Sequence, residues 1–276
     1  MTTPFPGRER IFQHFPIDNR SPSKLTPGQI QHYNEKGYIF PLDVFSDDEI
    51  AVHRAYFDDL MERATELGWS NYDMKSWHQY CAGIYDMGTD SRILDYVQDL
   101  LGETVILWAT HFFNKIPGDL KRVSWHQDAP FWHLSPSKVV TVWLAIDDTD
   151  IENGAMKFVP QSHLHGKIDY MESAAEEHNV LDLTVHEVHQ YGNDPISIEL
   201  KAGQISLHSD LLLHSSEPNH SNRRRCGLTM RFAPADVERT NPDRHTEAIL
   251  CRGAEPKGHF RYISRPDGDR IPENSH

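Results

Sequence analysis

The feature that most constrains the fold is a series of short runs rich in β-branched and aromatic residues in the second half of the chain. Turn signals such as Pro117-Gly118 and Ala202-Gly203 separate these runs, and no long helical pattern intervenes. Many short strands without crossover helices favour a barrel or a double-sheet jelly roll over a parallel βαβ sheet. The expected strands are residues 105–115, 139–147, 155–159, 196–200, 205–208 and 227–233.

The first third of the chain carries helical punctuation instead. Thr26 and Gln29 have the spacing of a capping box, with a proline at the first helical position. Ser46, followed by three acidic residues, marks the start of a second helix. Three helices are expected: one from Thr26 to a stop at Gly37, one from Ser46 towards Gly68, and one between Asp90 and Leu101 closed by Gly102.

These patterns predict a simple organisation: helices first, then a mainly β core that is either a barrel or a jelly roll. Residues 1–24 read as an extended N-terminal arm, and residues 25–276 as a single domain. Within that domain we expect a helical part over 25–104 and the jelly-roll core over 105–240. The polar stretch 171–192 reads as an insertion.

Charge and cysteine usage narrow the class of partner. Lys and Arg number 27 against 41 Asp and Glu, a net charge of −14, which argues against nucleic acid and against an anionic membrane surface. No apolar run approaches the ~18 residues of a membrane helix, and the N-terminus lacks the apolar core of a signal peptide. Three widely spaced cysteines suggest no disulfide framework. We expect a cytoplasmic monomer or homodimer that acts on a small-molecule substrate.

The 18 histidines direct attention to metal chemistry. His126 and Asp128 lie two residues apart, so on a strand they would project from the same face. An imidazole and a carboxylate side by side supply two of the three ligands of the facial triad that suits non-heme Fe(II). The third ligand must come from elsewhere. His214, at the end of an apolar run and eleven residues before Arg225, is preferred over its rival His208.

Other polar residues have plain structural interpretations. His163 and His165 are expected to cap the loop after Val159. The three arginines at 223–225 are poor grounds for a nucleic-acid patch in so acidic a chain. Arg231, further along the strand that follows Arg225, reads as an ion-pair partner.

Taken together and in this order, the motifs resemble the phytanoyl-CoA dioxygenase family of Fe(II)- and 2-oxoglutarate-dependent oxygenases. The resemblance extends over about residues 25–234, with one departure at Gln161, where the family usually has glycine. The matching motifs are Trp-His-Gln-Asp at 125–128, Asn-Gly-Ala at 153–155, Val-Pro-Gln-Ser-His at 159–163 and His-Ser-Ser at 214–216, with Arg225 behind them.

The resemblance implies a jelly-roll, cupin-like core (a double-stranded β-helix) and a role for each matching position. An arginine suits the dicarboxylate because its planar fork matches a carboxylate bidentately and stays charged. The implied Fe(II) ligands are His126, Asp128 and His214, and the implied 2-oxoglutarate contacts are Arg225 and Ser216 at the distal carboxylate and Asn114 near the metal.

The implied reaction consumes O2 and converts 2-oxoglutarate to succinate and CO2 while a substrate C–H bond is hydroxylated. Halogenating relatives have a small residue at the position of Asp128, so its presence favours hydroxylation over chlorination. Two other classes stay open: a zinc-dependent jelly-roll hydrolase, which would not need Arg225, and a non-catalytic binding protein. All three ligand positions carry a metal-binding residue, which argues against a non-catalytic binding protein.

The substrate is suggested by fewer residues. Trp132 and His133 are expected near the pocket mouth, and Lys121 and Arg122 are suited to neutralise an acidic group such as a phosphonate. An aromatic cluster at 77–80 offers cation–π surfaces, although ordinary core is the more frequent role of such rings. The stretch 108–143 resembles bacterial oxygenases acting on aminoalkylphosphonates. A small zwitterion of this type is therefore the expected substrate, with ectoine and free amino acids as alternatives.

Overall fold

Capping chemistry starts the helices where the sequence predicts. Thr26 Oγ1 accepts from the Gln29 amide at 3.2 Å while Gln29 Oε1 accepts from the Thr26 amide at 2.8 Å, and Ser46 with Glu49 repeats this reciprocal pair. Gly37 ends the first helix in the left-handed conformation, at φ 87°. The three predicted helices are confirmed and a short fourth appears: α1 (Pro27–Lys36), α2 (Asp47–Glu66), α3 (Ala82–Gly88) and α4 (Ser91–Leu101).

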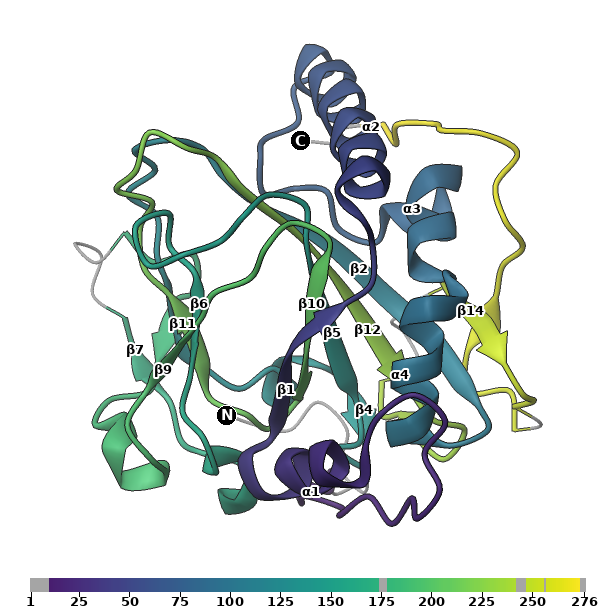
Figure 1. Cartoon of the computed structure of the whole chain (residues 1–276), viewed down its shortest axis with the longest axis vertical. Helices are drawn as coiled ribbons and strands as arrows, with labels where there is room; N and C mark the ends of the chain where they lie inside the picture. Colours follow the sequence, from purple (N-terminus) through teal and green to yellow (C-terminus); the bar gives the residue numbers. More distant parts are fainter. Residues whose placement is uncertain (1–9, 174–177, 242–246, 256, 274–276) are drawn as a thin grey trace.

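A computed structural model describes residues 10–173, 178–241, 247–255 and 257–273, and its framework is a pair of β-sheets (Figure 1). All six predicted strands are present. The larger sheet has the order β1 (Tyr38–Asp43), β10 (Gln204–Ser209), β5 (Val140–Ala145), β12 (Arg225–Ala233), β2 (Val105–Lys115), β14 (Glu247–Arg252) and β15 (Arg261–Tyr262). The smaller has the order β3 (Val123–His126), β11 (His214–Ser216), β6 (Met156–Phe158) and β9 (Ile196–Ile198).

The remaining strands form two-stranded pairs at the periphery. They are β4 (Leu134–Ser135) with β13 (Glu238–Arg239), and β7 (Met171–Glu172) with β8 (Leu183–Thr184). The second pair lies within the predicted insertion, whose residues 174–177 fall outside the described part of the chain.

Successive side chains along β12 point to opposite faces of the larger sheet, and each face packs against a different apolar core. Cys226, Leu228 and Met230 pack with residues of the four helices on the outer face of the larger sheet, which α2, α3 and α4 flank in Figure 1. The intervening residues face the smaller sheet. Gly227 lies so close to Trp143, a member of the core between the sheets, that a β-carbon there would clash with the indole. Apolar cores on both faces of one sheet confirm the expected jelly roll.

Two strands of the larger sheet come from outside the predicted 105–240 core. β1 lies within the segment expected to be helical and pairs with β10, and β14 follows residue 240 and pairs with β2. β1 is short, contains Pro41 and forms the sheet edge, which is where a proline is tolerated in a strand. β1 and β10 are far apart in the sequence, and local propensity does not indicate which distant segments pair.

The described part of the N-terminal arm, residues 10–24, is held at both ends. Arg10 donates to the carbonyls of Pro130 at 3.1 Å, Leu134 at 3.4 Å and Ala129. At the other end the buried Asp99 carboxylate accepts from the amides of 23–25 at 2.7–2.8 Å. Residues 1–9 of the predicted arm fall outside the described residues. Among the described helices, none has the length and apolar character required to cross a bilayer.

We predict that Asp99→Ala lowers the free energy of unfolding by about 1–3 kcal/mol, because three amides lose a charged acceptor. Burial opposes ionisation of Asp99, but these amides lower its pKa overall. The stabilisation is therefore present above the unfolded-state pKa of about 3.9 and is lost as pH falls through the lower folded-state value.

Urea unfolding at neutral pH and at acidic pH measures this effect. Asp18→Ala is the matched control, since Asp18 lies on the arm with 77% of its side chain exposed. An unchanged midpoint for Asp99→Ala at neutral pH would mean that the arm is not anchored through this carboxylate.

Candidate metal and cosubstrate site

The predicted metal ligands converge between the two sheets. His126 ends β3, Asp128 follows it, and His214 begins β11, which pairs with β3 so that the two histidines are directly opposite. One ligand atom from each residue lies within 4.8 Å of the others, and all three side chains are buried. The imidazole centroids are 4.0 Å apart, and His126 Nε2 is 3.8 Å from Asp128 Oδ1. Two imidazoles and one carboxylate form the donor set that suits Fe(II).

Backbone carbonyls orient both histidines. Nδ1 of His126 lies 2.8 Å from the carbonyl oxygen of Ser124, and Nδ1 of His214 lies 2.9 Å from that of Leu212. A carbonyl can only accept, so Nδ1 carries the proton and Nε2 keeps its lone pair for a metal. Burial, followed by the neighbouring His214, lowers the pKa of His126 to about 3, which keeps this ring neutral.

The larger sheet supports the carboxylate ligand. The Thr141 hydroxyl lies 3.5 Å from Asp128 Oδ2. Burial alone would raise the pKa of Asp128, but Arg231 and the surrounding imidazoles lower it below its usual value. Arg10 holds the turn that follows Asp128 through the Ala129 and Pro130 carbonyls. Asp128 is thus kept ionised and in place.

His208, the rival third ligand, lies beside the cluster without joining it. Its ring centroid is 5.0 Å from that of His214, and neither ring nitrogen has a hydrogen-bond partner. It projects from β10 of the larger sheet, next to Thr141 on β5. The geometry supports the preference for His214 and shows that a third imidazole, that of His208, faces the same space.

The predicted cosubstrate residues Arg225 and Ser216 are both buried. Arg225 is 2% exposed, and its Nε and Nη2 donate to the Gly154 carbonyl at 3.1 and 2.7 Å. Its guanidinium carbon lies 5.5 Å from the centroid of the Trp143 ring. Burial lowers the pKa of Arg225 to about 10, so the group remains charged at neutral pH. Ser216 follows His214 by two residues on β11 and shares its face.

The strand register places the predicted residue Asn114 and its neighbour Lys115 differently. It pairs with Cys226, which packs under the helices, whereas Lys115 pairs with Arg225 and shares its face of the sheet. Lys115 is 1% exposed and its Nζ donates to the carbonyls of Ser216, at 3.4 Å, and Glu217. Strand alternation therefore puts Asn114 and Lys115 on opposite faces of β2, and a cosubstrate contact by Asn114 stays a prediction.

The four predicted substrate residues separate into two groups. Trp132 and His133 line a cavity of about 110 Å³ beyond Asp128. Lys121 instead lies over the Tyr72 ring at 4.5 Å, and Tyr72 is close enough to Arg225 for each to affect the other's pKa.

Arg122 belongs to this second group. Burial, Arg225 and to a smaller extent Arg122 lower the pKa of Lys115, which places Arg122 near the same end of the barrel. Lys121 and Arg122 thus lie towards the predicted cosubstrate site.

The aromatic cluster at 77–80 and His163, for which the sequence suggests structural roles, do not line the metal site. In the aromatic cluster at 77–80, Trp77 is 1% exposed and packs against Trp69, and His78 bonds to Thr110 and to a backbone carbonyl. His163 is buried beside His14 in the loop after β6.

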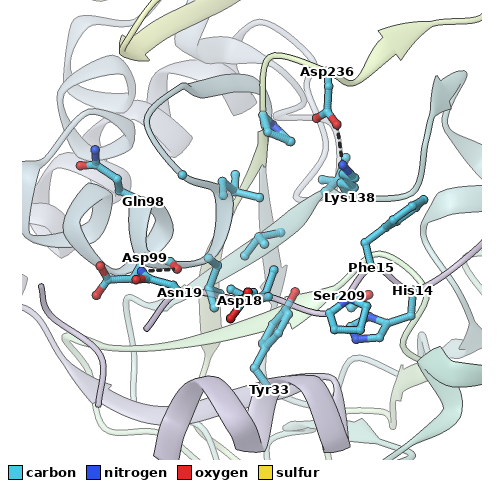
Figure 2. Close-up of a pocket in the computed structure, with 18 of the residues that line it drawn as sticks. His14, Phe15, Asp18, Asn19, Tyr33, Gln98, Asp99, Lys138, Ser209 and Asp236 are labelled. Atoms are coloured by element: carbon cyan, nitrogen blue, oxygen red, sulfur yellow. Dashed lines mark hydrogen bonds and ion pairs between the residues drawn. The ribbon is translucent and has the colours of Figure 1, made fainter. Parts of the chain in front are cut away.

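A larger cavity, of about 790 Å³, lies apart from the metal cluster (Figure 2). The arm residues His14 and Asp18 meet Tyr33 of α1 and Asp99 of α4 around it. Among the described residues, its lining includes none of the predicted site residues. Its wall contains Val140 and Ser209, the chain neighbours of Thr141 and His208. Because adjacent residues of a strand point to opposite faces, this cavity lies on the outer face of the larger sheet.

A jelly roll that encloses a buried His-Asp-His cluster, with a buried arginine on the facing sheet, has the donor set that suits a non-heme Fe(II) site. The family model for phytanoyl-CoA dioxygenase matches residues 33–227, more than half of the chain, so the chain belongs to the phytanoyl-CoA dioxygenase family. It is therefore a 2-oxoglutarate-dependent dioxygenase that uses Fe(II), which confirms the family, enzyme and cofactor predictions.

Relatives of the chain include proteins with different described substrates. It is 33% identical to a phytanoyl-CoA dioxygenase domain-containing protein 1 homolog from Dictyostelium discoideum over 75% of this chain and 68% of that protein. It is 32% identical to a probable alpha-ketoglutarate-dependent hypophosphite dioxygenase from Stutzerimonas stutzeri over 58% of this chain, a match that spans 56% of that relative's length. A methylphosphonate hydroxylase from Gimesia maris is 24% identical over 75% of this chain and 80% of that protein.

Solved structures agree with this fold. A non-heme monooxygenase, ThoJ, in its nickel complex superposes with a TM-score of 0.71 at 25% identity, covering 87% of this chain and 89% of that one.

We predict that His214→Ala weakens binding of Fe(II), or of Co(II) as an air-stable substitute, by more than roughly 100-fold. Loss of a direct ligand should exceed the 10–100-fold cost of losing an outer-shell partner. His208→Ala is the matched control and should keep the metal affinity within a few-fold. Calorimetric titration measures both, and a larger loss in His208→Ala than in His214→Ala would reverse the assignment.

Proposed function

We propose that the enzyme hydroxylates an aliphatic carbon of a small polar or zwitterionic metabolite, with an organophosphonate of the 2-aminoethylphosphonate type as the leading substrate. The observation that carries the hydroxylase proposal is the buried cluster of His126, Asp128 and His214, with Arg225 on the sheet that faces it. The relatives described as a hypophosphite dioxygenase and a methylphosphonate hydroxylase support a phosphorus oxyanion.

His126, Asp128 and His214 would hold Fe(II) between the two sheets. When bound, Fe(II), 2-oxoglutarate and O2 supply the oxidising chemistry that hydroxylates a C–H bond and releases succinate and CO2. The protein presents two neutral imidazoles through fixed Nδ1–H bonds and holds Asp128 ionised beside Thr141. The buried walls between the sheets keep stray water from the reacting carbon.

Arg225 is proposed to bind the distal carboxylate of 2-oxoglutarate, with Ser216 beside it. Two of its nitrogens donate to Gly154, which fixes the plane of the guanidinium. Lys115 shares this face, and burial followed by Arg225 lowers its pKa to about 6. A dicarboxylate in this position would favour the charged form of Lys115, which makes the amine a second anchor.

The substrate is proposed to approach from the opposite side, by Trp132 and His133. Ectoine and amino acids are the competing substrates of the same reaction, and a substrate panel that includes them distinguishes the three classes. We expect a monomer or homodimer that acts in the cytoplasm on a free small molecule, without a nucleic-acid or membrane partner.

We predict that Arg225→Ala raises the 2-oxoglutarate concentration needed for half-maximal succinate formation by roughly 10–100-fold, the equivalent of losing charged hydrogen bonds worth about 1.5–3 kcal/mol. Succinate is measured with Fe(II), ascorbate and O2, with and without 2-aminoethylphosphonate. Arg223→Ala is the control, because Arg223 lies in the same tract with 45% of its side chain exposed. Unchanged kinetics in Arg225→Ala would remove the anchor role, and substrate turnover without 2-oxoglutarate would instead indicate a hydrolase.

A further inference from the structure

Arg231 projects from β12 on the same face as Arg225. The two residues are six positions apart, so their α-carbons are separated by roughly 20 Å along the strand. Arg231 pairs across the sheet with Thr141, whose hydroxyl contacts Asp128. Arg231 therefore lies at the Asp128 end of the metal cluster, too far from Arg225 for both to hold the same end of one small dicarboxylate.

Arg231 lacks the partner expected of an inward-facing arginine. Arg224 on the same strand segment pairs with Asp147 and Asp58, and Arg225 is bonded to Gly154. Among the residues that the structure describes, Arg231 forms no ion pair and its buried Nε has no hydrogen-bond acceptor. Its guanidinium carbon lies 5.0 Å from the centroid of the Trp132 ring, and Asp128 is the acidic group whose charge acts on it. The charges of Arg231 and Asp128 stabilise each other, so the sequence interpretation of Arg231 as an ion-pair partner holds in part, without a direct contact between the described residues.

The indole face of Trp132 is already occupied by a cation. A substrate ammonium would meet the charge of Arg231 there, so the cation–π role suggested by the aromatic residues does not suit this position. Trp132 is also packed edge-on to Trp108, with centroids 4.9 Å apart. The ring lies against the guanidinium of Arg231, whose buried Nε has no hydrogen-bond acceptor among the described residues and could donate to another group.

The adjoining cavity has the charge of an anion site. Phe131, one of its walls, lies 6.2 Å from the His126 ring, so the cavity opens close to the metal cluster. Arg231 adjoins this cavity through Trp132 and is not one of its walls, whereas Arg239 is a wall, and no lining residue among those described is acidic. The walls are Trp108, Phe131, Trp132, His133, Leu134, Arg239 and Phe260.

We propose that Arg231, held by Trp132, binds the anionic group of the substrate and so selects small oxyanions, with Arg225 serving the cosubstrate on the other side of the metal. This inference rests on the proposed function and deepens it. A guanidinium fork can donate two parallel hydrogen bonds to a phosphonate, a phosphinate or a carboxylate. The anionic group would be fixed at Arg231, and the carbon attached to it would then face the metal.

The test is calorimetric titration, without O2, of enzyme loaded with Fe(II) and 2-oxoglutarate. The probes are methylphosphonate, hypophosphite and acetate as anions, and tetramethylammonium as the cation. We expect the wild type to bind at least one anion more tightly than the cation. Arg231→Gln should weaken that binding by roughly 10–100-fold, and Arg231→Lys by less, because lysine keeps the charge but loses the fork. Arg20→Gln, at a side chain 87% exposed, is the charge-matched control and should bind as the wild type does.

Three results would overturn the inference: equal anion affinity in Arg231→Gln and wild type, no anion binding by the wild type, or loss of Fe(II) and 2-oxoglutarate binding in Arg231→Gln. The last result would make Arg231 a support for Asp128 rather than a substrate residue. Failure of the proposed function gives a different result, since the wild type itself would then fail to bind 2-oxoglutarate with Fe(II) or to form succinate. The relative order of phosphonate, phosphinate and carboxylate identifies the oxyanion.

Discussion

The site depends on the pairing of two short strands. β3 and β11 meet so that His126 and His214 lie opposite each other, although 88 residues separate them in the chain. The carbonyl two residues before each histidine fixes the ring through Nδ1, so the same strand geometry sets both position and tautomer. Asp128 lies beside them because β3 ends at His126 and the chain turns directly after it. A slip of one residue between these strands would turn the second imidazole away from the first.

The two sheets have different tasks. The smaller sheet supplies the imidazoles, whereas β12 of the larger sheet carries a guanidinium towards each end of the space between them. Arg225 is bonded and fully buried, as suits an anchor for a cosubstrate used in every turnover. Arg231 lies against the Trp132 ring, and its buried Nε has no hydrogen-bond acceptor among the described residues, as suits a substrate that arrives and leaves. Trp143 and Gly227 pack tightly between these ends and separate them.

Local signals in the sequence were sufficient for much of this account. Capping boxes marked α1 and α2, short apolar runs marked the strands, and the motif around His126 gave the metal ligands. What the sequence could not give was pairing across the sheets. Asn114 and Lys115 are adjacent, and only the register of β2 with β12 shows which of them faces Arg225. The same holds for Arg231, whose contact with Trp132 joins segments 99 residues apart.

The most direct test is anomalous diffraction at the iron edge from crystals grown without O2 in the presence of Fe(II) and 2-oxoglutarate. The account predicts one strong iron peak bounded by His126, Asp128 and His214, with the dicarboxylate extending from the metal to Arg225. Iron bound through His208 in place of His214, or 2-oxoglutarate lying away from Arg225, would contradict it.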